Sequence, residues 1–233
     1  MNPLWQQLAD RASITLSQSQ LEQLSRYLDL LLEANQTMNL TRIDAREQAE
    51  LGHVGDSLTL LPYLPDKGFS LADVGSGGGV PGIPLAISRP DAQVLLIEST
   101  QKKAAFLQRA AQELGLSNVR ISTWRAEDEA RGPHREYFDV VAARALAAMN
   151  VLVEWCLPLV KLRGKLLAMK GGRIAEELPA AARAIKALGG GEAIVHPANL
   201  PGAEHHVIVE ISKLHHTQRR FPRTTAQTKQ QPL

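Results

Sequence analysis

Hydrophobic residues recur at helical spacing near the start of the chain. Behind Ser17 they form one apolar stripe: Leu21, Leu24, Leu28, Leu31 and Leu32. Ser17 and Gln20 have the spacing of a capping box, in which each side chain satisfies a free backbone N–H group of the first helical turn. A long amphipathic helix is therefore predicted to begin here.

Two more helices are predicted in the same region. One covers residues 3–11, and the other covers residues 45–64 with a break near Gly52 or Gly55. Because every element predicted in this region is a helix, residues 1–66 are expected to form a helical extension.

From Phe69 onward, short apolar runs alternate with helical segments, which predicts a mostly parallel sheet covered by helices on both faces. The five runs are residues 69–74, 93–98, 118–123, 138–142 and 164–170. The helices between them are expected to begin near Pro81, Thr100 and Leu146. Gly115 is expected to end the second of these helices as a left-handed cap.

Two further runs, residues 193–195 and 206–211, are too close together for a crossover helix and predict an antiparallel hairpin. The predicted fold is therefore α/β: a Rossmann-like, mostly parallel sheet of seven strands with an antiparallel last strand. Such a sheet is typical of class I methyltransferases rather than of dehydrogenases. We assign residues 67–214 to this domain and residues 215–233 to a basic C-terminal tail.

A glycine-rich turn follows the first predicted strand. Gly75, Gly77 and Gly79 let the backbone approach a ligand closely, and the helix that follows offers free N–H groups. Gly77, Gly79 and Gly82 also match the dinucleotide motif G-x-G-x-x-G, although this match alone is weak.

Two acidic residues beside the turn narrow the kind of nucleotide site that is predicted. Asp73 lies near the end of the strand before the turn, where a strand-end cap is the alternative interpretation. Glu98 ends the next strand, about twenty residues beyond the turn, where a carboxylate can accept hydrogen bonds from both hydroxyls of a ribose. The acid, the glycine turn and the second acid together resemble the S-adenosylmethionine (SAM) site of class I methyltransferases.

The composition argues against a disulfide-linked, a metal-binding or a membrane-spanning protein. The 233 residues are 44% hydrophobic and 21% charged, as in ordinary globular proteins. The single cysteine, Cys156, can form no internal disulfide and is expected in the core, and no cysteine and histidine cluster has the spacing of a metal site. No apolar run is long enough to span a bilayer and no signal peptide is evident, so we expect a cytoplasmic protein with no membrane partner.

The basic character of the chain is concentrated at its C-terminal end. The net charge is only +2, but no acidic residue follows Glu210. The basic residues after it are Lys213, Arg219, Arg220, Arg223 and Lys229. We expect this end to be a mobile surface segment that holds RNA phosphates as an electrostatic arm.

Four motifs in order resemble one family, the bacterial small-subunit rRNA guanine-N7 methyltransferases (RsmG, also called GidB). They are Asn-Leu-Thr at 39–41, His-Val-Gly-Asp-Ser at 53–57, the turn and its flanks at 73–86, and Ala-Arg-Ala at 143–145. The resemblance implies methyl transfer from SAM to N7 of one guanine of 16S rRNA, by resemblance the guanine at position 527. It also implies 16S rRNA or the small ribosomal subunit as the partner. Separately, we expect a monomer.

The residues expected at the cofactor combine the two acids and the turn with what the resemblance implies. By resemblance, Ala126 and Glu127 border the adenine and Arg144 lies at the reactive end. The full set is Asp73, Gly75, Gly77, Gly79, Val80, Glu98, Ala126, Glu127 and Arg144. An ordinary ion pair with a nearby acid is the alternative role for Arg144.

We expect no catalytic acid or base, because N7 of guanine carries a free lone pair at neutral pH. His53, Asp56 and Ser57 are crowded on one helical turn and are interpreted as a structural network. The alternative is that His53 or Asn39 contacts the guanine.

Four basic residues near the predicted sheet edge are candidates for binding RNA phosphates, although lone cations more often lie on a solvated surface. They are Lys102, Lys103, Arg125 and Lys170. The residues expected at the substrate are Asn39, His53, Lys102, Lys103, Arg125 and Lys170. Among the tryptophans, Trp124 is the one expected near the cofactor edge, and Trp155 is assigned to the core.

Three other functions stay open at this point. The chain could be a class I methyltransferase acting on another RNA, a protein or a small molecule, or an NAD-dependent oxidoreductase. It could also be a catalytically silent RNA-binding module with the same fold.

Overall fold

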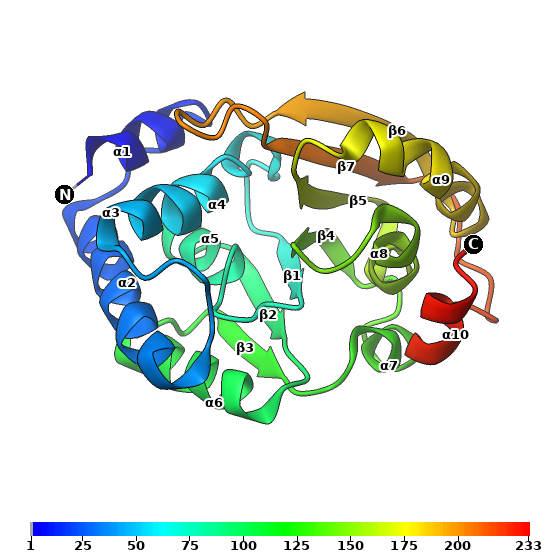
Figure 1. Ribbon diagram of the computed structural model, residues 1–233, viewed down its shortest axis with the longest axis horizontal. Coiled ribbons are helices and arrows are strands. Elements are labelled where there is room, and N and C mark those ends of the chain that lie inside the picture. Colours follow the sequence, from blue (N-terminus) through cyan, green and yellow to red (C-terminus); the bar gives the residue numbers. More distant parts are fainter. Residues whose placement is uncertain (1) are drawn as a thin grey trace.

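A seven-stranded sheet crosses the middle of the protein, and helices cover both of its faces (Figure 1). The computed structural model describes residues 2–233. The strands are β1 (Ser70–Val74), β2 (Gln93–Ile97), β3 (Val119–Ser122), β4 (Phe138–Arg144), β5 (Val160–Lys170), β6 (Gly190–Pro197) and β7 (Val207–Lys213).

Their order across the sheet is β3-β2-β1-β4-β5-β7-β6. The first five strands run parallel, and β7 runs antiparallel to both of its neighbours. The predicted mixed sheet is therefore confirmed, as is the hairpin that closes it. In a parallel sheet of this kind, ligands bind outside the carboxyl ends of the strands.

Successive side chains of each central strand enter two separate cores. Leu71 packs in one core and Ala72 in the other, as the two-residue period of a strand requires. The first face is covered by α1 (Pro3–Asp10), α2 (Gln18–Met38), α5 (Gly82–Ser88) and α6 (Gln101–Glu113). The second is covered by α7 (Ala126–Arg131), α8 (Met149–Cys156), α9 (Ile174–Ala187) and α10 (Thr225–Gln230).

The helical extension contains the predicted capping box at Ser17 and Gln20. The break expected near Gly52 or Gly55 is absent. Between α3 (Arg46–Ala49) and α4 (Asp56–Leu58) the chain instead winds through a π-helix over Glu50–Gly55. Such a segment contains one residue more than an α-helical turn, so the helix widens without stopping.

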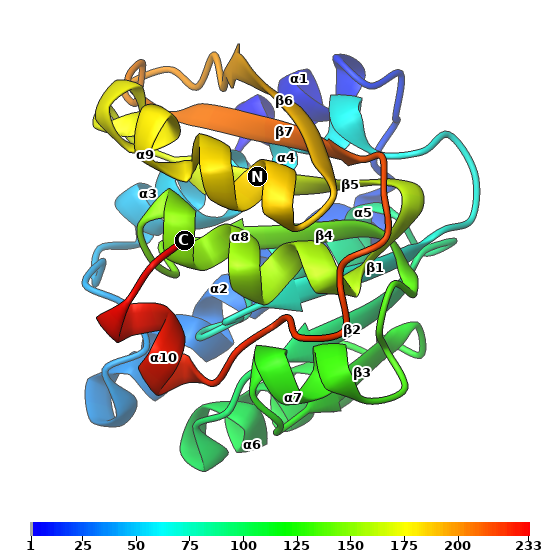
Figure 2. The ribbon, with the colours of Figure 1, turned by 90° about the vertical axis from the view of Figure 1, so that its right-hand side faces the viewer.

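The C-terminal tail packs against the domain, so the expectation of a mobile segment is wrong. Phe221 is buried, and the Arg223 guanidinium donates to both oxygens of the buried Glu154. Arg131 and Arg135 donate to backbone carbonyl oxygens of this tail. Figure 2 shows the tail running to α10, which lies beside α8.

Two smaller expectations concern single features. Gly115 has a φ of 68°, the predicted left-handed cap after α6, and Cys156 is buried in the second core. Within residues 2–233, no helix combines the length and the apolar character that crossing a membrane requires.

Candidate functional site

The glycine-rich turn leaves β1 in a backbone conformation that glycine adopts readily. Gly75, Gly77 and Gly79 have φ values of 73°, 55° and 98°. A side chain on Gly79 would collide with Ile83 Cδ1, 2.6 Å from the position of its Cβ. The missing side chain of Gly79 therefore faces the core and lets the chain turn, and its contact with the cofactor stays a prediction.

Asp73 lies beneath this turn. Its Oδ2 accepts the N–H of Gly82 at 3.0 Å, which fixes the start of α5, and its side chain is completely buried. Burial raises the pKa of Asp73 to about 7. Asp73 holds the turn from behind, as the strand-end alternative describes, and its contact with the cofactor stays a prediction.

Glu98 follows β2 and forms hydrogen bonds with the side of the glycine-rich turn. Its Oε2 accepts the N–H of Gly77 at 3.0 Å and its Oε1 accepts the N–H of Thr100 at 2.7 Å. The carboxylate lines a pocket of about 280 Å³, which we call the Glu98 pocket. Of the residues predicted at the cofactor, this pocket brings together Gly75, Gly77, Glu98, Ala126 and Glu127.

Two more pockets continue from the Glu98 pocket along the carboxyl ends of the strands. A bridging pocket of about 180 Å³ shares Gly75 and Gly77 with it and adds Val80 and Arg144. A large pocket of about 760 Å³ shares Arg144 and His53 with the bridging pocket. Because neighbouring pockets share lining residues, the three lie side by side, and we refer to them together as the groove.

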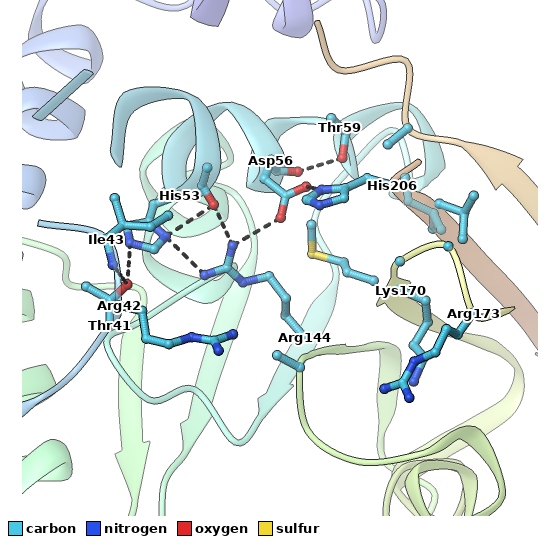
Figure 3. A pocket seen from close by; sticks show the side chains of 18 of the residues that line it. Thr41, Arg42, Ile43, His53, Asp56, Thr59, Arg144, Lys170, Arg173 and His206 are labelled. Atoms are coloured by element: carbon cyan, nitrogen blue, oxygen red, sulfur yellow. Dashed lines mark hydrogen bonds and ion pairs between the residues drawn. The ribbon is translucent and has the colours of Figure 1, made fainter. Parts of the chain in front are cut away.

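Arg144 stands at the junction of the bridging and large pockets (Figure 3). Its Nη1 donates to the carbonyl oxygen of Gly52 at 2.6 Å and to Asp56 Oδ2 at 3.0 Å. The ion pair that sequence reasoning allowed for Arg144 is therefore present. It ties β4 to the π-helical segment and still leaves Arg144 facing the groove.

His53 belongs to the same network. Its Nδ1 lies 3.1 Å from Arg144 Nη2 and 3.2 Å from the carbonyl oxygen of Gly52. Its Nε2 lies 3.0 Å from Thr41 Oγ1. Burial, followed by the charge of Arg144, lowers the pKa of His53 to about 4, which makes the ring neutral at physiological pH.

The remaining partners complete a structural network, as the crowded spacing predicts. Ser57 Oγ donates to the backbone oxygen of His53 at 2.7 Å, and His206 Nδ1 lies 3.0 Å from Asp56 Oδ1. Both oxygens of Asp56 are therefore engaged, one by Arg144 and one by His206 (Figure 3). Asp56 is therefore held in place from two sides, by β4 and by the chain before β7.

The residues predicted at the substrate separate into three places. Asn39 and His53 line the large pocket, as does Lys170, whose ammonium group pairs with Glu177 at 2.6 Å. Lys103 and Arg125 line the Glu98 pocket instead. Lys102 is exposed on α6 and lines none of the three pockets, so its expected place at the site is not supported by the geometry.

Sequence reasoning missed several residues of the groove. Arg42 and Arg173 line the large pocket, where Figure 3 shows them with Lys170. Neither arginine belongs to a motif, so no local signal marks it. Tyr27 of α2 donates from its hydroxyl to the carbonyl oxygen of Gly78 at 2.8 Å, and this buried tyrosine braces the turn from the helical extension.

Comparison with known proteins settles the family. A family model described as rRNA small subunit methyltransferase G matches residues 20–207. The chain belongs to this family. The Ribosomal RNA small subunit methyltransferase G of a Roseiflexus species is 42% identical over 94% of both chains. The protein of the same name from Lactobacillus delbrueckii subsp. bulgaricus is 39% identical over the full length of both.

Solved structures place this methyltransferase G family member in a wider fold group. A SAM-dependent methyltransferase from Aquifex aeolicus is 13% identical with a TM-score of 0.53, covering 76% of this chain and 97% of that one. The cofactor-bound Rv0187 protein from MTB is 20% identical with a TM-score of 0.57, covering 82% and 91%. These likenesses show the fold alone, which is the predicted class I methyltransferase fold.

Proposed function

We propose that this chain transfers a methyl group from SAM to N7 of one guanine of 16S rRNA, acting in the cytoplasm on the rRNA or the small ribosomal subunit. The observation that carries the proposal is the groove itself. It leads from a carboxylate-lined pocket, past the glycine turn, to a large pocket lined by Arg42, Arg144, Lys170 and Arg173. The relatives named above are rRNA methyltransferases by name.

The residues of the Glu98 pocket suit SAM. The Glu98 carboxylate is the acceptor that ribose hydroxyls need, and Ala126 and Leu146 offer apolar contact to an adenine. The bridging pocket, beside Gly75, Gly77 and Val80, suits the methionine end. When bound there, SAM supplies an electrophilic methyl group.

The chain itself has to align the guanine, exclude water and stabilise the RNA. Methylation of N7 needs no proton removal, which agrees with His53 being neutral and with Asp56 having both oxygens bonded. The cations of the large pocket would hold RNA phosphates next to the target base. Positioning, rather than acid–base chemistry, is then the source of catalysis.

The test uses 16S rRNA and small ribosomal subunits from cells that lack this methyltransferase. With labelled SAM and the purified chain, we expect label in the RNA and mass mapping to find N7-methylguanine at one position. Transfer only to a small molecule or a protein would contradict the proposal. A nicotinamide absorbance assay with the same preparation tests the oxidoreductase alternative, and we expect no change in absorbance.

The rate of methyl transfer should not depend on a titrating base. At saturating RNA, we expect the single-turnover rate to be nearly flat from about pH 6.5 to 8.5, since His53, with a pKa of about 4, stays neutral throughout. Rapid-quench measurements across this range provide the check. A slope near one per pH unit that disappears in His53→Ala would show a proton transfer through His53.

A further inference from the structure

The C-terminal segment, residues 221–233, lies beyond the part of the chain that the family model matches. It is nevertheless fixed firmly to the second face of the sheet. The Arg223 side chain donates to both carboxylate oxygens of Glu154, at 2.8 and 2.6 Å, and its backbone N–H donates to the same group at 2.9 Å. Phe221 is only 3% exposed.

Beyond this anchor the segment turns toward the groove. The capping box of Thr224 and Gln227 starts α10, and the side chain of Thr228 is fully buried against the domain. Two residues of α10, Thr225 and Lys229, line the Glu98 pocket. In Figure 2, α10 lies near the end of the segment, beside α8.

The surroundings of Lys229 favour a role inside the pocket. Its ammonium nitrogen lies 5.6 Å from the ring centroid of Trp155, which also lines the Glu98 pocket. Glu98 and Glu127 line the same pocket and give it a negative charge that favours a cation there. An ammonium group held on an aromatic face, in a pocket that two carboxylates also line, is positioned to donate to a polar ligand.

We infer that the C-terminal segment forms one wall of the cofactor pocket, and that Lys229 and Thr225 contact the adenosine part of the bound methyl donor. Their ammonium and hydroxyl groups would donate to ring nitrogens or ribose oxygens. The inference rests on the proposed function, because it takes SAM as the occupant. It replaces the expectation that the basic tail serves only as an arm for RNA.

Calorimetry with SAM tests the inference on full-length protein and four variants. Lys229→Ala should weaken SAM binding about tenfold, as expected for one hydrogen bond from a charged group. Thr225→Val should cause a smaller loss, and deletion of residues 224–233, which keeps Arg223 and its anchor, should cause the largest. Gln230→Ala alters an exposed residue of the same helix outside the pocket and should bind SAM like wild type.

Two outcomes would overturn the inference while the proposed function stands. One is unchanged SAM affinity in Lys229→Ala and Thr225→Val, both folded by circular dichroism. The other is that Lys229→Ala lowers rRNA affinity and the salt dependence of RNA binding with SAM affinity intact, which would make the segment an RNA arm. Failure of the wild-type protein to bind SAM would remove the proposed function and the inference together. If the deletion variant fails to fold, the two point variants decide.

Discussion

Replacing Glu98 by alanine is expected to weaken SAM binding about ten- to a hundredfold. The variant would lose the interaction of the carboxylate with the ribose, in total about 1.5–3 kcal/mol, the range for hydrogen bonding to a charged group. The same change releases the N–H groups of Gly77 and Thr100, so the turn loses its lateral support. Calorimetry on the purified variant measures the affinity.

Glu98→Gln is the matched control for this change. The glutamine amide keeps one acceptor oxygen and has nearly the same size as the carboxylate. The affinity of Glu98→Gln for SAM should therefore lie between those of wild type and Glu98→Ala. Thermal denaturation shows whether both variants are folded. Wild-type affinity in a folded Glu98→Ala protein would contradict the place of Glu98 at the cofactor.

Replacing Arg223 by alanine is expected to lower the free energy of unfolding by about 3 kcal/mol. Glu154 is completely buried, so removal of its partner leaves an uncompensated carboxylate in the protein interior. Urea denaturation at neutral pH measures the change. Arg219→Ala, which alters an exposed residue of the same tail, should change the free energy by less than about 0.5 kcal/mol.

The stability lost in Arg223→Ala should become smaller as the pH falls. Burial alone would raise the pKa of Glu154, but the hydrogen bonds from Arg223 outweigh it and hold this pKa below its ordinary value. A carboxylate with a lowered pKa stabilises the fold at pH values above its unfolded pKa, and this contribution disappears as the pH falls through its folded pKa. The difference between wild type and Arg223→Ala should therefore shrink below about pH 4.5. A constant difference down to pH 3 would contradict the ionised pair.

Local sequence signals were sufficient for the elements that form the floor of the groove. The apolar runs of β1 and β2 predict buried parallel strands, and the backbone demands of Gly75 and Gly77 predict the turn between β1 and α5. Glu98 was found because the end of the second strand is fixed by the same pattern. Each of these features depends on residues close together in the chain.

Contacts between distant segments left no such signal. Arg223 and Glu154 are 69 residues apart, and Tyr27 and Gly78 are 51 residues apart. Tyr27 looks like one more apolar position of its helix, and Arg223 looks like one more charge of a basic tail. Asp73 was placed correctly along the chain, but only the packing of α5 decides that its carboxylate points under the turn.

The π-helix at Glu50–Gly55 makes the site sensitive to the length of one segment rather than to its composition. Deleting a single residue there would let the backbone close into an ordinary α-helix, a locally favourable change. Since successive helical residues are about 100° apart, deletion of Val54 or Gly55 would rotate His53 relative to Asp56 and disturb their shared contact with Arg144. Deletion of either residue would thus keep the segment helical and still disrupt the junction of the groove.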